Sequence, residues 1–182
     1  SDEILEIPES LQSNVRYMKT SRLLPLDSAV FSNVISVAPN NRIVVEGSYP
    51  LEFLKNMCYL QKGTSISSKD IEEGSIPVVA GGRAPAYYNN SSNRDGNIIT
   101  VSASGASAGY VGYWDTPIFA SDCTTIKSKD EEKILTAYVY YVLKDNQDAV
   151  YTLQKGQGQP HVYPDDLGMI RIPLPSVEKQ KS

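Results

Sequence analysis

Residues 97–114 read NIITVSASGASAGYVGYW, and this stretch decides the fold class. Residues 97–103 are typical of a strand that places Ile99 and Val101 on one face, and residues 110–114 are typical of a second strand. The small residues between them predict the loop that joins the two strands. The centre of the chain is therefore expected to be β-structure.

Helical patterns lie further along the chain. Ser128 is a candidate N-cap with Glu131 at the capping-box position, and helical spacing of apolar residues continues to Lys144. A short second helix is predicted over 147–154. Strands first and helices later, without regular alternation, predict an α+β fold. Weaker signals predict a helix over 8–19, a hairpin of 34–38 and 42–46, and strands over 76–80 and 169–172.

The length of the chain and its first residues limit the number of domains that it can contain. A chain of 182 residues and 20.0 kDa suffices for one ordinary domain with an extension. We expect residues 1–47 to be a linker from the preceding part of a longer protein and residues 48–182 to be the domain. The longest apolar run, 137–143, is too short to span a membrane. Because the sequence begins Ser-Asp-Glu, with neither Met nor a signal region, we expect a fragment of a cytoplasmic protein.

Charge and residue usage exclude several classes of function. A net charge of −4 argues against a protein that holds nucleic acid by bulk electrostatic attraction. The sequence has too few zinc ligands for a structural zinc site, because it contains one histidine, His161, and two cysteines, Cys58 and Cys123. Two cysteines also suit small buried thiols better than a disulfide framework. Neither a phosphate-binding loop nor the Asn/Asp-Pro-Pro-Tyr/Phe sequence of adenine-N6 methyltransferases is present. We therefore predict no metal, no cofactor and no catalysis in this chain.

One stretch of the sequence matches an enzymatic motif, but its surroundings differ from those that the motif requires. The sequence Gly-Ala-Ser-Ala-Gly over 105–109 matches the nucleophile elbow of serine hydrolases, with Ser107 as nucleophile and His161 as base. Either Asp122 or Asp145 would orient that base. The elbow requires a helix after the serine, whereas a strand is predicted there. The chain is also too short for the hydrolase scaffold.

Three polar segments have the composition of a contact surface. They are 62–65, the pair 80–83 and 87–90, and 155–161. Glutamine and asparagine can form paired hydrogen bonds with adenine, and arginine can do so with guanine. Glycines beside these side chains let the backbone approach a partner closely. Over 74–114 only Arg83, Arg94 and Asp95 are charged, so such a surface would act mainly through directional hydrogen bonds.

An ordered set of motifs extends from about residue 50 to residue 180. Its members are Tyr-Pro-Leu at 49–51, Gln-Lys-Gly-Thr-Ser-Ile at 61–66, Gly-Ser-Ile-Pro-Val-Val at 74–79, Ser-Gly-Ala-Ser-Ala-Gly-Tyr-Val at 104–111, Phe-Ala-Ser-Asp-Cys at 119–123, the run 153–161, and Ile-Arg-Ile-Pro-Leu-Pro at 170–175 with Glu-Lys-Gln at 178–180. In this order they resemble the target recognition domain of type I restriction–modification specificity subunits.

That resemblance implies a twisted, mainly antiparallel sheet with a few helices packed on one side, ending where a spacer helix begins. It implies a non-catalytic module that reads a short half-site in the major groove of double-stranded DNA for an adenine-N6 methyltransferase. The methyltransferase, as a separate subunit or a fused domain, would bind S-adenosylmethionine, and a restriction subunit would be present only in a cleaving enzyme.

The expected contact residues follow from the resemblance together with residue chemistry. Near the DNA backbone we expect Lys62, Thr64 and Ser65; nearer the bases we expect Arg83, Tyr88, Asn89, Gln157, Gln159 and His161, with Ser104 and Ser107 as second candidates. If the segment that carries Gln157 and Gln159 is extended, these two side chains point to opposite sides, and only one of them reads a base. Two alternatives stay open, namely the small hydrolase using Ser107 and His161, and a protein- or glycan-binding β module.

Overall fold

The computed structural model describes residues 43, 45, 47–67, 69–156 and 158–181, which belong to one unit of the chain spanning residues 40–182. The helix predicted over 8–19 lies outside the described residues, as do all but two residues of the predicted hairpin. The described elements are, in chain order, β1 (Leu51–Phe53), α1 (Leu54–Met57), β2 (Cys58–Lys62), β3 (Ile76–Val79), β4 (Tyr87–Asn89), β5 (Ile98–Ser102), β6 (Val111–Trp114), β7 (Phe119–Ala120), β8 (Cys123–Ser128), α2 (Thr136–Asp145), α3 (Gln147–Tyr151), α4 (Pro164–Gly168), β9 (Arg171–Pro173) and α5 (Val177–Gln180).

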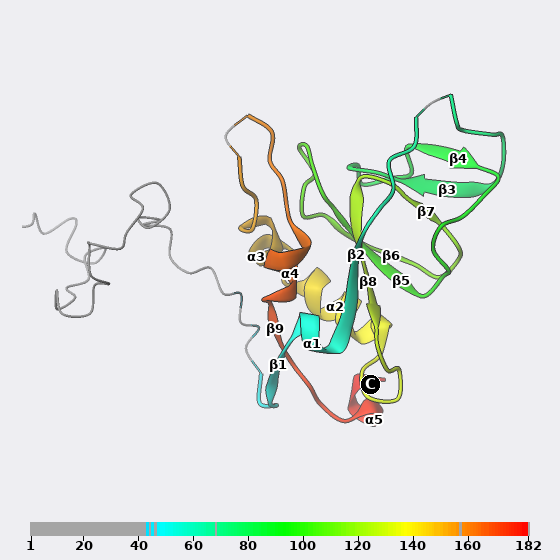
Figure 1. Ribbon diagram of the computed structural model, residues 1–182. Coiled ribbons are helices and arrows are strands. Elements are labelled where there is room, and N and C mark those ends of the chain that lie inside the picture. Colours follow the sequence, from blue (N-terminus) through cyan, green and yellow to red (C-terminus); the bar gives the residue numbers. More distant parts are fainter. Residues whose placement is uncertain (1–42, 44, 46, 68, 157, 182) are drawn as a thin grey trace, which may run out of the picture. The chain divides into compact units, whose positions relative to one another are not determined.

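The central sheet has four antiparallel strands in the order β2-β8-β5-β6 (Figure 1). Its two middle strands are β5 and β8, and β5 is buried along its whole length. Ile126 of β8 lies opposite Leu60 of β2 on one side and Ile99 of β5 on the other. The strands predicted over 97–103 and 110–114 are therefore present as β5 and β6, at the centre and at one edge of this sheet.

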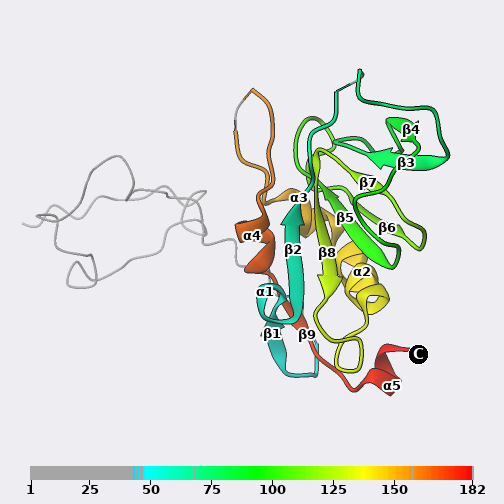
Figure 2. The same cartoon turned by 45° about the vertical axis from the view of Figure 1, so that its right-hand side comes forward.

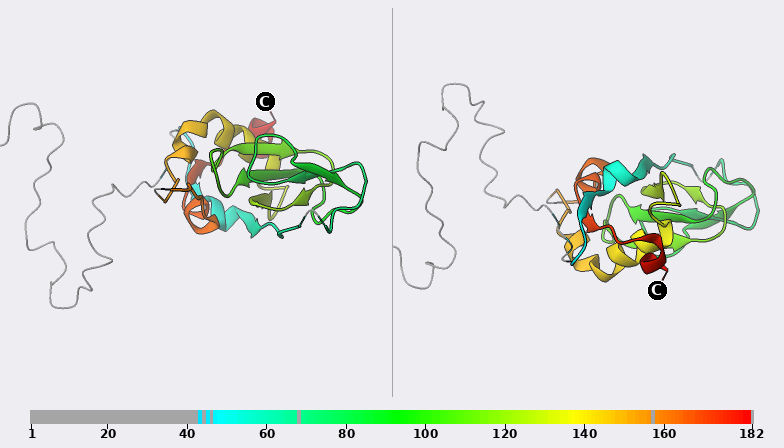
Figure 3. Two further views of the ribbon diagram at one scale, coloured as in Figure 1. Left: turned by 90° about the horizontal axis from the view of Figure 1, so that it is seen from above. Right: turned by 90° about the horizontal axis from the view of Figure 1, so that it is seen from below.

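One face of the central sheet is covered by helix α2, with α3 following it (Figures 2 and 3). Ile99 and Val101 are both fully buried, in the same core cluster as Val139 and Leu143 of α2. The predicted shared face of these two strand residues is thus the core face. The arrangement is α+β, with a mainly antiparallel sheet and helices packed on one side. Among the described residues, no helix has the length and apolar character needed to cross a membrane.

Helix α2 begins seven residues later than its sequence signal predicts, at Thr136 with Leu135 as the N-cap residue. The Ser128 hydroxyl accepts a hydrogen bond from the backbone N–H of Asp130 (3.0 Å), and this closes a local turn instead of starting a helix. Glu131 accepts hydrogen bonds from the backbone N–H (3.1 Å) and hydroxyl (2.5 Å) of Thr136, the first residue of α2. The acidic turn therefore precedes the helix, and the Glu131 carboxylate accepts the first backbone N–H of the helix, that of Thr136.

Two smaller sheets complete the structure. The order β4-β3-β7 forms a three-stranded sheet, in which β3 and β7 run parallel. A second core cluster, which includes Val79, Ile98 and Ile118, packs between this sheet and the central one. Strands β1 and β9 pair with each other near the two ends of the described chain, with Leu51 opposite Pro173. The strands predicted over 76–80 and 169–172 are present as β3 and β9.

Both cysteines are buried free thiols, which yields a direct chemical test. Burial raises the pKa of the Cys58 and Cys123 thiols to about 12. The reactive thiolate is then only about 10⁻⁴ of each thiol at pH 8. We expect iodoacetamide at pH 8 to leave both residues unmodified in the folded protein and to modify both in urea, as read by mass spectrometry. Rapid labelling of either residue without urea would contradict the described packing.

Candidate functional site

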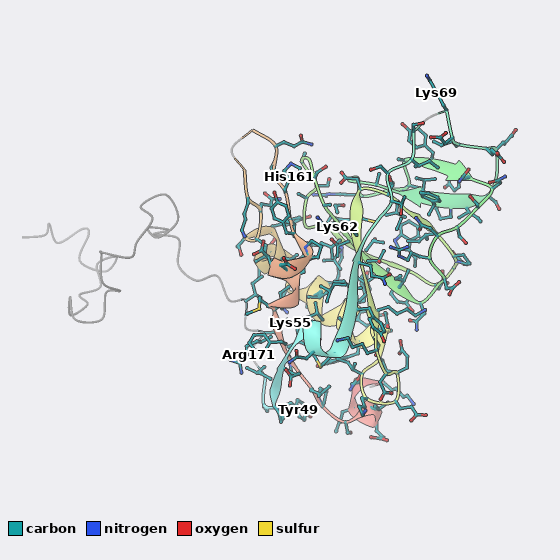
Figure 4. The ribbon with its side chains drawn as sticks, viewed as in Figure 1. Tyr49, Lys55, Lys62, Lys69, His161 and Arg171 are labelled. Carbon is teal, nitrogen blue, oxygen red and sulfur yellow. The ribbon has the colours of Figure 1, made fainter. Side chains whose placement is uncertain are left out.

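One end of the central sheet gathers most of the predicted contact segments. The carboxyl ends of β2 and β5 and the amino ends of β6 and β8 meet there, because the sheet is antiparallel (Figure 1). We call this region the loop end; it consists of residues 63–65, 81–83, 103–110, 121–122, 155–156 and 158–161. Figure 4 shows Lys62 and His161 toward this end of the sheet, whereas Lys55, Arg171 and Tyr49 lie away from it.

The loops of this region are hydrogen-bonded to one another through their backbones. The N–H of Ala103 donates to the carbonyl of Asp122 (3.1 Å), and the N–H of Gly105 donates to the carbonyl of Pro160 (3.0 Å). The Ser102 hydroxyl donates to the carbonyl of Gly82 (3.2 Å). Four segments that lie far apart in sequence therefore form one connected surface with a defined backbone.

A polar cavity of about 250 Å³ opens at the loop end. Three of the predicted contact residues, Lys62, Ser65 and His161, line it together with Asp122 and Thr124. The Thr124 hydroxyl is buried and has no hydrogen-bond partner among the described residues. A buried polar atom normally has a partner, so the Thr124 hydroxyl is an unsatisfied group in the wall of this cavity.

The glycine of the Lys-Gly-Thr sequence is explained by close backbone approach. A Cβ atom on Gly63 would lie 2.0 Å from the carbonyl oxygen of Ser121. At this short separation the N–H of Gly63 donates to the carbonyl of Cys123 (2.8 Å), and the N–H of Thr64 donates to that of Ala120 (2.9 Å). The loop after β2 is thus seated directly on the turn between β7 and β8.

The described residues of the segment 155–161, which we call the 155–161 arm, project from the domain beside the cavity (Figure 1). Lys155 and His161 close its base through two backbone hydrogen bonds of 2.8 Å. The Lys155 ammonium forms an ion pair with Asp166 (2.7 Å) and is therefore already neutralised within the domain. Gln159 is exposed near the tip, whereas Gln157 lies outside the described residues. The predicted opposite orientation of these two glutamines stays a prediction.

The segment predicted as 80–83 with 87–90 is divided by the structure. Arg83 is exposed at the loop end, with its guanidinium carbon 5.5 Å from the ring centre of Tyr110. Tyr88 is exposed on β4 of the small sheet and does not line the cavity. Asn89 is buried, accepts the backbone N–H of Glu72 (2.9 Å) and donates to Ser91. Its amide is engaged inside the domain, which favours a structural role for it.

The two serines of the glycine-rich loop have different surroundings. Ser104 donates a hydrogen bond to the carboxylate of Asp122. Ser107 lies in a turn in which its carbonyl accepts the N–H of Tyr110 (2.9 Å), and strand β6 follows directly. The nucleophile elbow needs a helix at that point. The backbone around Ser107 therefore does not support the hydrolase interpretation.

Two residues important to the loop end were not among the predicted contacts. Asp122 lines the cavity, whereas the sequence suggests only a place for it in a hydrolase triad. Arg94 donates to Thr125 Oγ1 (3.1 Å) and to the carbonyls of Asn93 (2.7 Å) and Lys62 (2.9 Å). The only sequence signal for Arg94 is its charge in a nearly uncharged stretch.

Among the described residues, no cluster of His, Cys, Asp and Glu is arranged to hold a metal ion.

Comparisons with known proteins identify the family and the fold of this chain. Residues 51–182 match the family described as the type I restriction modification DNA specificity domain. The fold is similar to a type I restriction–modification S subunit from M. genitalium, at 23% identity and a TM-score of 0.63, covering 73% of this chain and 36% of that one. It is also similar to the HsdS subunit from Thermoanaerobacter tengcongensis, at 16% identity and a TM-score of 0.55, covering 73% and 34%.

A third similar structure comes from a study of complex assembly and conformational transition of the type I R-M system. It is 16% identical, with a TM-score of 0.59, and the match covers 75% of this chain and 36% of that one. At these identities the likeness shows the fold. The match spans about a third of the length of each of these three chains. No curated protein matches the sequence.

Proposed function

Because the chain belongs to the type I restriction modification DNA specificity domain family, a non-catalytic recognition module, we propose that its loop end reads one short half-site in the major groove of duplex DNA. The observation that carries this proposal is the convergence of Lys62, Ser65 and His161 on one polar cavity, with Arg83 and Gln159 exposed on neighbouring loops.

The charge distribution supports a division of labour with a partner. Among the described residues of the loop end, Lys155 is paired with Asp166, and the chain as a whole carries a net charge of −4. Phosphate contacts supply most of the sequence-independent affinity for DNA, whereas contacts to base edges give specificity. A methyltransferase subunit or domain would then supply most of the phosphate attraction, bind S-adenosylmethionine and transfer the methyl group.

The position of the last described helix fits a division of labour between this chain and a methyltransferase partner. Helix α5 lies at the end of the domain opposite the loop end (Figure 1). Gln180, the last residue of this helix, accepts a hydrogen bond from the N–H of Leu135 and donates to the carbonyls of Lys133 and Pro175, which attaches α5 to the segment before α2. We assign α5 as the beginning of a spacer helix, residues 48–182 as the recognition domain, residues 1–47 as a linker, and the cytoplasm as its compartment. A restriction subunit would join only in a cleaving assembly.

Salt dependence of DNA binding tests the backbone role of Lys62. With few free cations, the full chain should neutralise about two or three phosphates, which gives a log–log salt slope on the order of −2 to −3. Replacing Lys62 with alanine should weaken binding to all sequences alike and reduce the magnitude of the slope by about 1. Fluorescence anisotropy over a range of salt concentrations gives both quantities.

Lys133 is the matched control, since it is an exposed lysine beyond the far end of β8. Lys133→Ala changes the net charge equally and should leave the slope unchanged. Equal slopes for the Lys62 and Lys133 variants would remove Lys62 from the interface. Binding that is indifferent to DNA sequence in the wild-type chain would instead favour the protein- or glycan-binding module.

A further inference from the structure

Asp122 is a negative charge in a region otherwise suited to DNA. It is exposed, and it is the one carboxylate among the described residues that line the cavity with Lys62 and His161. No ion pair to Asp122 is formed within the described part of the chain. A carboxylate repels phosphate, so at a DNA-binding surface Asp122 suits a group that donates a hydrogen bond and not the DNA backbone.

The carboxylate is held in a defined position by the turn that carries it. The Ser121 N–H donates to the carbonyl of Val79 (2.8 Å), and the Asp122 carbonyl accepts from Ala103 (3.1 Å). These bonds attach the turn to β3 on one side and to the segment after β5 on the other. A side chain on this turn is therefore preorganised, which lowers the ordering entropy of any contact that it makes.

The neighbours of the carboxylate define which of its oxygens is available. The Ser104 hydroxyl donates to Oδ2 of Asp122, so the bond leaves Oδ1 as a free acceptor within the described structure. Gly81 lies beside them, and a Cβ on it would be 3.0 Å from Oδ2 and 2.8 Å from the Ser104 carbonyl oxygen. The glycine thus leaves room for the carboxylate and serine to remain together.

Only an amino group suits such an acceptor on the major-groove edge of a base. Cytosine presents its N4 amino group there and adenine its N6 amino group, whereas guanine O6 and thymine O4 are acceptors that a carboxylate repels. We propose that Asp122, positioned by Ser104, is a specificity-determining residue that accepts a hydrogen bond from the exocyclic amino group of cytosine or adenine. This inference rests on the proposed DNA-reading function and names one of its contacts.

The first experiment selects binding sites from a randomised duplex DNA library with the full chain and with Asp122→Asn. Asparagine keeps the size of the side chain and an acceptor but adds a donor, so it no longer excludes guanine or thymine. We expect the wild-type chain to enrich one site and the variant to lose discrimination at one base pair by about 5- to 150-fold, which corresponds to 1–3 kcal/mol. Glu132→Gln, an equal charge change beyond the opposite end of β8, should enrich the wild-type site unchanged.

The second experiment identifies the contacted amino group. In the enriched site, each cytosine is replaced in turn by 2-pyrimidinone and each adenine by purine, both of which lack the exocyclic amino group. One replacement should weaken wild-type binding but change binding by Asp122→Ala, which has no side-chain acceptor, by less than about twofold. The base at that position tells cytosine from adenine. Ser104→Ala should show a smaller loss at the same base pair, because it frees the carboxylate to rotate.

The outcomes separate the two proposals. If no sequence is enriched by the wild-type chain, the proposed function fails and the Asp122 contact fails with it. If a site is enriched and Asp122→Asn retains full discrimination at every position, the function stands and the Asp122 contact is overturned. A lower melting temperature of the variant with unchanged specificity would likewise show that the Asp122–Ser104 pair is only structural.

Discussion

Replacing Gly63 with alanine is expected to lower the free energy of unfolding by about 3 kcal/mol or more, because the added Cβ has no space. It would meet the Ser121 carbonyl oxygen at 2.0 Å, and that atom belongs to a backbone that cannot rotate away. The loop after β2 must move off the β7–β8 turn, which breaks the hydrogen bonds from Gly63 and Thr64. Urea denaturation measures the effect, and the melting temperature should fall by roughly 6–12 °C.

Gly158 offers a matched control for this substitution. A Cβ on Gly158 meets nothing within 4 Å, and its φ is not in the left-handed region. Gly158→Ala should therefore change the free energy of unfolding by less than about 0.5 kcal/mol. If Gly63→Ala is as stable as Gly158→Ala, the seating of the Lys-Gly-Thr loop on the β7–β8 turn is wrong.

The second large effect is expected for Arg94, and it should appear in stability instead of DNA binding. Its partly buried guanidinium joins the end of β2, strand β8 and Asn93 through three hydrogen bonds. Arg94→Ala should cost about 2–4 kcal/mol in the free energy of unfolding, since it leaves these acceptors without their charged donor. Arg94→Lys should recover only part of this, because a single ammonium lacks the planar fork that reaches all three.

Arg83 is the contrasting arginine, exposed at the loop end. If it contacts a base, Arg83→Ala should reduce affinity for the cognate site by about 1–3 kcal/mol and leave the melting temperature nearly unchanged. Arg94→Ala, assayed at a temperature where it stays folded, should bind the cognate site within about threefold of the wild type. The reverse assignment of the two effects would show that the arginine facing DNA has been misidentified.

Local patterns in the sequence were sufficient for the individual strands. The alternation that places Ile99 and Val101 on one face and the turn residues that follow them depend on near neighbours, so β5 and β6 could be predicted. The parallel pairing of β3 with β7 and the second core around Ile118 join distant segments, and no local pattern encodes them. The start of α2 was misplaced because Ser128 makes the same kind of bond in a local turn as in a helix cap.

The candidate site shows the same limit. Lys62, Ser65 and His161 were selected by residue type, and the cavity that unites them forms only when β2 and the 155–161 arm meet. Asn89 has the chemistry of a base reader, but its burial depends on packing that the sequence alone does not reveal. Asp122 was passed over as a DNA contact because an acid is unfavourable there until its serine partner and its position are known.

The pairing of β1 with β9 has a consequence for protein synthesis. Leu51 lies opposite Pro173. Strand β1, the first described strand to be translated, therefore has no partner until β9 has been made. The central pairing of β2 with β8 can form earlier, once residue 128 has been made. Contacts between distant segments slow folding, and an unpaired strand edge can bind other chains. The nascent polypeptide therefore completes its fold only after residues 171–173 leave the ribosome, and a message truncated before them would release a chain with an open β1 edge.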